Sequence, residues 1–597
     1  MMPETSNKGS ASASHEEATR EVPNHLEPER LGCETDMELL PKGYFYSRFF
    51  LGSLMAVGLG TWAGVASFGY AAPILGIINA DLGPDPRYIW ISLVYTAVLA
   101  ICLAPLGRLT DIFGRRYFFV GGGVIGVVGS IVCATATSIP MLIAGNVLLG
   151  ICSATQMSFH FVLGELIPLK YRYIGNAFLY LYTIPGSGFA PSIAYEFIER
   201  YPNVGWRGIY WMILAINGAA LTCWVLFYFP PSFQKKHRHE QGLTVMYCLK
   251  NFDWIGLFLM SGGFLVFLLG MSWGGAVYPW KSAATISSIV VGVVVMALFV
   301  LWELYAPLKE PLIPMHLFRN RHWLIACLLL GLGAGVYYAF AIIWPMQCSV
   351  LYNNGDLRYL GAISSLVGVG MIAGQITGGL LAAKIGKAKF QCMVVFTIGG
   401  TFLACLAMTT VDNKDTAIAL IFLGCFWIGW NESVCLANST ICLDDQREIG
   451  IAGGLAASMR SAICAVLVAV YTSILTNRLT ETTSTGIPPK LIEAGLPAES
   501  IADFLGVVST AGTTAPASVY SGIQGITDKI VEVGVRAYQV ANVEAFRTVY
   551  FSTIAFSAIS IIMTIWAPNT EKWMTGNVAA TLNQEETTSD EEKAVRH

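Results

Sequence analysis

Glu432 and Arg460 are charged residues inside two consecutive apolar stretches, 416–439 and 449–475. A charged side chain in hydrocarbon costs about 2.5–3.5 kcal/mol on insertion scales, so it usually faces a cavity or a partner. If the stretches are antiparallel helices, both residues lie about 14–17 Å from the connecting loop, at ~1.5 Å per residue. They could therefore form an ion pair, either a static one or one in which Glu432 binds a proton after losing its partner.

Uncharged polar and aromatic side chains also occur in the apolar stretches. The polar groups could line a pathway for a proton or a small molecule, or form hydrogen bonds that only hold helices together. The aromatic groups could form an apolar binding wall, or belong to belts at the membrane surface. Beyond the charged pair, the candidates for a pathway are Gln375, Gln156, Asn146, Trp430 and Tyr182.

The elements that must hold these residues are membrane-spanning helices. Of the 597 residues, 54% are hydrophobic and 13% are charged, whereas about 25% of a soluble protein is charged. A helix needs roughly 20 apolar residues to cross a bilayer. Fourteen candidate spans are 49–78, 88–106, 117–135, 140–161, 174–197, 207–229, 254–272, 285–304, 323–345, 359–383, 390–410, 416–439, 449–475 and 547–567. The sequence predicts an all-α integral membrane protein.

Basic residues in the loops indicate the orientation of these spans. If the N-terminus is cytoplasmic, Lys and Arg concentrate in the inner loops and are sparse in the short outer loops. This asymmetry is typical of membrane proteins. An even number of spans then places both termini in the cytoplasm.

The loop between the second and third spans reads Gly107-Arg-Leu-Thr-Asp111-Ile-Phe-Gly114-Arg115-Arg116. Arginines are typical of any cytoplasmic loop, but that bias does not require glycines on both sides of an aspartate. Glycine lets two backbones approach closely. Asp111 precedes a helix, whose N-terminal end favours a carboxylate, and Arg115 and Arg116 can pair with that carboxylate or with helix-end carbonyls.

A second copy of this pattern follows the tenth span. Gly379 and Gly386 keep the Gly-to-Gly spacing of the first copy, and Lys387 follows as the basic residue, but Ala383 stands where Asp111 stands. A second short motif is also repeated, as Ile174-Gly-Asn-Ala and as Ile449-Gly-Ile-Ala, and we call it the echo motif. The offsets are 272 and 275 residues, which predicts that spans one to six repeat as spans nine to fourteen.

Small residues and prolines cluster in two further spans. The fifth span contains Gly186, Ala190 and Pro191, a combination that permits close packing and a kink. The tenth span has glycines at every fourth position, at 370, 374 and 378, so that they share one helix face. We expect that face to contact a neighbouring helix.

The loop at 107–116 resembles the G-x-L-x-D-x-x-G-R-R loop of the major facilitator superfamily, where it controls the cytoplasmic gate. The resemblance implies gating roles for Gly107, Asp111, Gly114, Arg115 and Arg116, and for their second-copy counterparts Gly379, Gly386 and Lys387. Family antiporters usually carry an arginine in the fourth span, in the pattern L-x-x-x-R-x-x-x-G. Asn146 fills that place here, between Leu142 and Gly150, so the usual proton-linked arginine is missing.

The resemblance narrows further. Fourteen spans, Asp253-Trp-Ile-Gly256 and Pro311-Leu-Ile-Pro314 are similar to the fourteen-helix drug:proton antiporter branch. Three further segments resemble the fungal trichothecene efflux pump group: Glu165–Arg172, Ala494–Pro497 and Met574–Ala579. Fungal siderophore-iron transporters share this plan more distantly. The implied fold has two six-helix halves plus two linker helices.

The expected domain organisation follows from the spans and the repeat. Residues 1–41 are polar and rich in Ser, Glu and Pro, a composition typical of a disordered tail, and they have no cleavable signal peptide. Residues 42–230 form the first half, 231–310 a cytoplasmic linker with two extra helices, and 311–567 the second half. The second half includes a long outer segment, 476–546, expected to fold as a cap, and 568–597 is a cytoplasmic tail.

The expected function is secondary active transport, with proton-coupled efflux of an amphipathic organic toxin or drug as the leading hypothesis and resistance to a mycotoxin or several drugs as its consequence. The alternatives are import of ferric siderophores by proton symport, and a non-transporting membrane sensor. The net charge of −3 gives no reason to expect nucleic acid. The 14 Cys include no C-x-x-C pair, so we expect no metal site, no cofactor and no enzymatic activity. The expected partners are a small-molecule substrate, protons and the bilayer, for a monomer in the plasma membrane or, alternatively, the vacuolar membrane.

Overall fold

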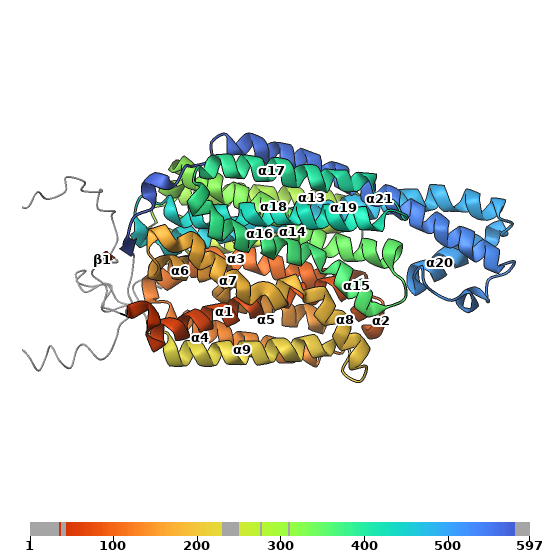
Figure 1. Cartoon of the computed structure of the whole chain (residues 1–597), viewed down its shortest axis with the longest axis horizontal. Helices are drawn as coiled ribbons and strands as arrows, with labels where there is room; N and C mark the ends of the chain where they lie inside the picture. The colour runs from red at the N-terminus through yellow and green to blue at the C-terminus, as the bar shows by residue number, and fades with distance from the viewer. Residues whose placement is uncertain (1–34, 37–42, 230–249, 275–277, 309–310, 579–597) are drawn as a thin grey trace, which may run out of the picture.

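The computed structural model describes residues 35–36, 43–229, 250–274, 278–308 and 311–578, which form an elongated helical bundle (Figure 1). Within these ranges, thirteen helices are long and apolar enough to cross a membrane. The remaining expected span, 174–197, consists of α7 (Arg172–Thr183) and α8 (Ala190–Arg200). A π-helical turn at Ile184–Gly188 and a bend at Phe189 separate them, so this span is present but interrupted.

The N-terminal half occupies one side of the bundle (Figure 1). The fourth expected span, 140–161, is interrupted by a turn at Met157, after which a second, short helix begins at Phe159. The helices of this half, besides α7 and α8, are α1 (Arg48–Gly69), α2 (Leu75–Leu82), α3 (Trp90–Phe113), α4 (Arg116–Ala134), α5 (Ile139–Gln156), α6 (Phe159–Leu166) and α9 (Arg207–Phe227).

The C-terminal half lies against it. Its helices are α14 (Arg321–Gln347), α15 (Leu357–Ser364), α16 (Leu366–Ile385), α17 (Ala388–Cys405), α18 (Lys414–Ile441), α19 (Ile449–Glu493) and α21 (Asp528–Thr564). The three glycines of α16 face α18, as expected from their spacing. A Cβ atom at Gly370 would lie 2.7 Å from the carbonyl oxygen of Phe422, and one at Gly378 would lie 3.0 Å from the Cα of Trp430. Only glycine permits this close approach.

Two linker helices, α12 (Trp254–Trp273) and α13 (Ala283–Tyr305), follow the N-terminal half. They pack closely on each other: a Cβ added at Gly263 of α12 would lie only 3.0 Å from the backbone nitrogen of Met296 in α13. On its other side, α12 places Phe264 and Leu268 in a cluster with Ala97 and Ala465 of the two halves. Most of α13 is exposed and apolar, as a surface facing lipid must be. The linker pair therefore lies beside the seam between α3 and α19.

The end of the bundle beyond the spans carries a small cap, seen at the far right of Figure 1. The expectation that the thirteenth span ends at 475 is wrong, since α19 continues to Glu493 with Pro488 and Pro489 inside it. Proline disfavours a helix interior, but the extension packs with α20 (Ile501–Ala511) and α21 around one apolar core. This tertiary packing outweighs local propensity. The cap has its own apolar core, built from Ile487, Leu491, Phe504, Val508, Tyr520 and Ile530.

At the opposite end, residues near both chain ends meet. Strand β1 (Thr35–Asp36) pairs antiparallel with β2 (Asn577–Val578), and we call this the termini end, as opposed to the cap end. Residues 35–36 lie in the segment 1–41 for which we expected disorder, so at these two positions that expectation is wrong. The rest of 1–41 and residues 230–249 and 579–597 lie outside the described residues.

Candidate functional site

Glu432 and Arg460 form an ion pair at the centre of the bundle, as their depths predicted. The guanidinium of Arg460 donates from Nε to Oε1 of Glu432 at 2.9 Å and also from Nη2 to the same oxygen. Gln375 Nε2 donates to the other carboxylate oxygen at 3.0 Å. The Glu432 side chain is 4% exposed and that of Arg460 is 13% exposed. Both carboxylate oxygens thus have donors inside the protein, which is the arrangement that a buried charge requires.

Close packing of α16 on α18 brings Gln375 to the carboxylate. A Cβ at Gly429 of α18 would lie 3.1 Å from the backbone nitrogen of Gln375, and Gly374 lies directly against the Phe426 carbonyl. Any larger residue at these points would separate the helices. The glycine spacing is therefore the local reason that three helices can bring a carboxylate, a guanidinium and an amide together.

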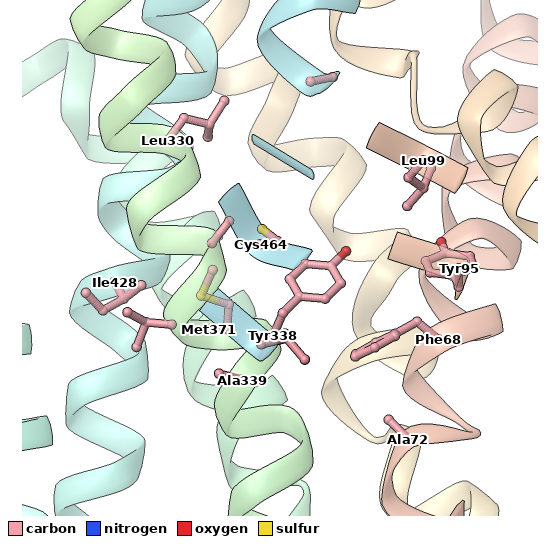
Figure 2. Close-up of a cluster of buried hydrophobic side chains, with 14 of the residues drawn as sticks. Phe68, Ala72, Tyr95, Leu99, Leu330, Tyr338, Ala339, Met371, Ile428 and Cys464 are labelled. Atoms are coloured by element: carbon pink, nitrogen blue, oxygen red, sulfur yellow. The ribbon is translucent and has the colours of Figure 1, made fainter. Parts of the chain in front are cut away.

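Aromatic side chains cover the charged group from both halves. The Arg460 guanidinium lies 5.5 Å from the centre of the Tyr338 ring, within reach of a cation–π contact. Figure 2 shows the Tyr338 ring projecting from α14 toward Phe68 and Tyr95 of the N-terminal half. The Phe68 and Tyr338 ring centres are 4.9 Å apart. The pair is thus at the meeting point of the halves.

A cavity of about 60 Å³ lies beside this cluster. Its lining comes from both halves and includes the apolar Phe68, Leu99, Met157 and Met371, the hydroxyl-bearing Thr61, Tyr180, Ser187 and Ser461, and the polar trio Gln375, Glu432 and Arg460. A water molecule needs at least ~10–15 Å³, whereas small-molecule pockets span about 300–1,000 Å³. In this conformation the cavity has room for a few waters and must expand to admit an organic molecule.

Contacts between the halves close the termini end of this cavity. Arg172 of the N-terminal half donates from Nη1 to the Thr440 carbonyl at 2.8 Å and from Nη2 to Gln446 Oε1 at 3.0 Å. The Tyr173 hydroxyl lies 2.5 Å from Asn438 Oδ1 and donates to it. Apart from Gln446, these groups lie on helices α7 and α18, which also line the cavity. Opening this end of the cavity therefore requires these hydrogen bonds between the halves to break.

The repeated glycine motifs meet crosswise at the same end. A Cβ at Gly107 of α3 would lie 2.6 Å from the Gly450 carbonyl of α19, and one at Gly379 of α16 would lie 2.8 Å from the Tyr173 carbonyl of α7. Gly450 belongs to the Ile449 echo, and Tyr173 precedes the Ile174 echo. The first glycine of each copy, Gly107 or Gly379, therefore packs at the echo motif of the other half.

Further contacts join the halves at the cap end. Ser192 of α8 donates from its backbone to Ser365 Oγ at 3.1 Å, and Arg358 pairs with Glu196 at 3.1 Å. Nearer the cavity, the Ser187 and Tyr337 hydroxyls form a hydrogen bond. Since contacts join the halves at both ends, the structure corresponds to an occluded conformation.

The remaining residues of the two motif loops lie at helix ends. Gly114 ends α3 with φ 87°, a backbone conformation that favours glycine. Arg115 is buried in an ion pair with Glu165, and Arg116 donates to the Val225 carbonyl at 2.9 Å. The Asp111 side chain lies outside the described residues.

In the second copy, Gly386 ends α16 with φ 65°. The backbone N–H of Lys387 donates to Glu571 Oε1 at 2.7 Å. The start of the expected tail 568–597 thereby contacts the second motif loop.

Four expected pathway residues are not among the residues that line the central cavity. Asn146 donates to the Leu142 carbonyl of its own helix at 2.9 Å, and Gln156 accepts from the indole of Trp224 at 2.8 Å. Trp430 donates to Gln391 at 3.1 Å. The Tyr182 ring packs directly against Gly58 of α1. A Cβ added at Gly58 would lie 2.6 Å from Cγ of Tyr182. Each of them has contacts inside one half, so the cavity brings together only Glu432, Arg460 and Gln375 of the expected pathway.

The sequence alone assigns no role to Arg172, Tyr173 or Ser187. Arg172 ends the Glu165–Arg172 segment and lies two residues before Ile174, and neither place indicates its contacts with the other half. Ser187 lies in the π-helical turn at Ile184–Gly188, where Gly186 fits against Trp62, because a Cβ there would be 2.6 Å from Trp62 Cδ1. Ala190 and Pro191 begin α8 directly after the bend. The kink expected from these residues is present and presents Ser187 to the cavity.

Three curated relatives cover most of the chain. The trichothecene efflux pump TRI12 of Trichoderma arundinaceum is 27% identical over 91% of this chain and 90% of its own length. The protein of the same name from Fusarium sporotrichioides is also 27% identical, over 90% and 89%. The MFS-type transporter prx5 of Penicillium rubens is 27% identical over 84% of this chain and 87% of its own.

A family model described as the fungal trichothecene efflux pump (TRI12) matches residues 26–593. This match spans both halves, the linker helices and the cap. The multi-pass helical bundle with its two halves is the fold of major facilitator transporters, and the relatives are transporters, not enzymes. The chain belongs to the fungal trichothecene efflux pump family.

Proposed function

We propose that the protein exports a neutral amphipathic organic molecule and that protons drive this export through Glu432. The observation that supports this proposal most directly is the Glu432–Arg460–Gln375 cluster, which borders a water-sized cavity between the two halves. Ionisable residues inside a membrane bundle typically mark the pathway of a proton or a substrate. Binding near the midplane between repeats is typical of this architecture.

The proposed coupling depends on separation of the ion pair. In the occluded conformation, Arg460 and Gln375 together satisfy both oxygens of the Glu432 carboxylate. A carboxylate that loses its cationic partner in apolar surroundings takes up a proton more readily. Both helices belong to the C-terminal half, so the separation requires a shift of α19 relative to α18 within that half. Glu432 would then bind a proton in one conformation and release it in the other.

The proposed cargo follows from the lining and from the relatives. Phe68, Tyr337 and Tyr338 offer flat apolar surfaces, and Thr61, Thr183 and Ser461 offer hydroxyls. Because Glu432 and Arg460 neutralise each other, the lining suits an uncharged molecule with an apolar body and hydrogen-bonding oxygens. Two relatives are named trichothecene efflux pumps, so a trichothecene is the first cargo to test.

We further propose that the termini end is cytoplasmic and that the protein acts as a monomer in the plasma membrane. The concentration of Lys and Arg in the loops at that end supports this orientation. The gating role of Gly107, Asp111 and their second-copy counterparts is part of the same proposal. It is supported by the crosswise glycine contacts, which close the cavity at that end.

The test uses purified protein in liposomes with an imposed pH gradient and a tritium-labelled trichothecene. The wild type should accumulate or expel the label according to the direction of the gradient. Glu432→Gln should bind the label but not respond to the gradient. A structural pair would behave differently, since removing one charge of a buried pair leaves the other unpaired at a cost of about 3–5 kcal/mol.

Two outcomes would contradict the proposal. In the first, Glu432→Gln misfolds and the double variant Glu432→Gln/Arg460→Gln restores both folding and gradient-driven transport, which would make the pair a scaffold. In the second, yeast that lacks its own pumps and expresses the chain takes up ferric siderophores and gains no trichothecene resistance, which would favour an importer. The matched control is Glu544→Gln, the same change in the Glu544–Arg547 pair of α21, which lies outside the cavity lining.

A further inference from the structure

A second, larger cavity lies toward the cap end, between α3, α12 and α19. Its volume is about 520 Å³, compared with about 60 Å³ for the central cavity. This volume falls within the ~300–1,000 Å³ typical of small-molecule sites. We call it the lateral pocket and define it by Trp90, Leu93, Trp273, Ala469 and Thr472.

The lateral pocket and the central cavity share two of their walls. On α3 the central cavity is lined by Leu99 and Leu103, and the lateral pocket by Trp90 and Leu93. The six residues from 93 to 99 correspond to about 9 Å of helix. On α19 the central cavity ends at Ser461 and the lateral pocket begins at Val468, a separation of about 10 Å. The two spaces therefore follow one seam between the halves.

Alanines of α3 and α19 meet at the seam between the two spaces. Ala97 and Ala100 of α3 and Ala465 of α19 form the cluster there, together with Phe264 and Leu268 of α12. Small residues let helices approach closely and shift against each other with few steric barriers. The linker helix α12 is thus both the outer cover of the seam and a wall of the lateral pocket.

The chemistry of the lining selects one kind of occupant. Trp90 and Trp273 provide aromatic faces, and Thr472 and Ser473 provide hydroxyls. The charged groups at the rim, Asp85 and Arg87, bond to each other at 2.7 Å, so they offer no unpaired charge to a ligand. The pocket therefore suits a neutral amphipathic molecule, as the central cavity does once it expands.

We infer that the lateral pocket is a second binding site for the exported molecule, occupied after it leaves the central cavity and before it leaves the protein. This inference rests on the proposed function. It gives the linker helices a role in transport, since α12 supplies the wall that faces away from the two halves. Along α3 and α19, the residues that line this site lie on the cap side of those that line the central cavity.

The experiment measures how many molecules of a tritium-labelled trichothecene bind to the full-length protein in nanodiscs, and how fast the protein in liposomes transports it. Thr472→Phe fills the pocket from a half-buried position, and Ala469→Leu does so from a second position on the same helix. Val291→Phe, on the exposed face of α13 (49% exposed), is the matched control. Thermal stability of each variant is measured in the same nanodiscs.

We expect the wild type and Val291→Phe to bind two molecules per chain. Thr472→Phe and Ala469→Leu should bind one, retain the thermal stability of the control, and transport roughly tenfold more slowly, because a side chain in the pocket excludes the ligand by steric overlap. Wild-type binding of a single molecule, with unchanged transport in both pocket variants, would overturn the inference and leave the proposed function standing.

Two other results would also be decisive. If the pocket variants lose a co-purified phospholipid, detected by mass spectrometry, but bind and transport the trichothecene like the wild type, the pocket is a lipid site and the inference is wrong. If the wild type neither binds nor transports the trichothecene, the proposed export of this cargo fails, and the inference about its second site fails with it.

Discussion

Replacing Tyr173 with phenylalanine tests whether side-chain hydrogen bonds hold the termini end closed. The Tyr173 side chain is buried, with the residue 2% exposed. Its hydroxyl donates to Asn438 Oδ1 at 2.5 Å and lies 2.9 Å from Thr570 Oγ1. Both partners belong to the C-terminal half or the segment after it, so the hydroxyl links the two halves. The substitution removes one oxygen and leaves the ring in place.

The expected magnitude follows from those two bonds. Each neutral hydrogen bond contributes about 0.5–1.5 kcal/mol net, so losing both weakens the closed state by about 1–3 kcal/mol. In an open state the same groups bond to water, and the loss there is small. The equilibrium between closed and open conformations should therefore shift toward the open one by a factor of about 5–150.

Hydrogen–deuterium exchange of the full-length protein in nanodiscs measures this shift directly. Backbone amides protected by closure exchange in proportion to the population of the open state. Peptides that cover the end of α18 and the start of α19, about residues 436–456, should exchange faster in Tyr173→Phe by the same factor. Peptides from the cap should exchange as in the wild type, because the cap has a separate apolar core.

Tyr195→Phe is the matched control. Its hydroxyl donates to the Pro73 carbonyl at 3.2 Å, within the N-terminal half, so its loss should not change exchange at the termini end. If Tyr173→Phe leaves exchange of residues 436–456 within about twofold of the wild type, or if Tyr195→Phe raises it equally, the contacts between the halves do not control opening.

Two further predictions concern the first motif loop. Gly107→Leu should abolish transport and raise exchange at the start of α19, because its Cβ would lie 2.6 Å from the Gly450 carbonyl, whereas Gly121→Leu, with open space around that Cβ, should do neither. Normal transport by Gly107→Leu would show that close α3–α19 contact is unnecessary. Asp111→Asn, a prediction from the loop sequence, should reach the cell surface at the wild-type level and lose most transport, and equal transport at equal surface level would reject a gating role.

The positions of the spans and the central ion pair could be predicted from the sequence because both depend on local pattern. Apolar length alone locates a membrane helix, and helical rise alone places Glu432 and Arg460 at one depth. The contact between α16 and α18 could be predicted for the same reason, since glycines at every fourth residue mark one face. In each case the relevant information lies within one or two neighbouring elements.

The contacts between the halves could not be predicted, because they join residues far apart in the chain. Arg172 and Thr440 are 268 positions apart, and no local pattern distinguishes Arg172 from a basic residue that only sets topology. The extension of α19 beyond 475 depends on α20 and α21, which come later in the chain. Gln156 and Asn146 appeared suited to a pathway because they are polar, but their partners lie within the N-terminal half, which composition cannot reveal.

Contacts between the halves pair the copies of the internal repeat crosswise. Gly107 of α3 packs on the start of α19, and Gly379 of α16 packs on α7. The α3–α19 seam and the α16–α7 seam are therefore each formed by a glycine motif of one half and an echo motif of the other. Equivalent seams would be expected to open by the same motion. They differ, however, in what lies beside them: α12 packs along the α3–α19 seam, and the lateral pocket continues it. A symmetric rocking motion would therefore change the volume of a ligand-sized pocket beside the α3–α19 seam, where the linker helix α12 supplies one wall.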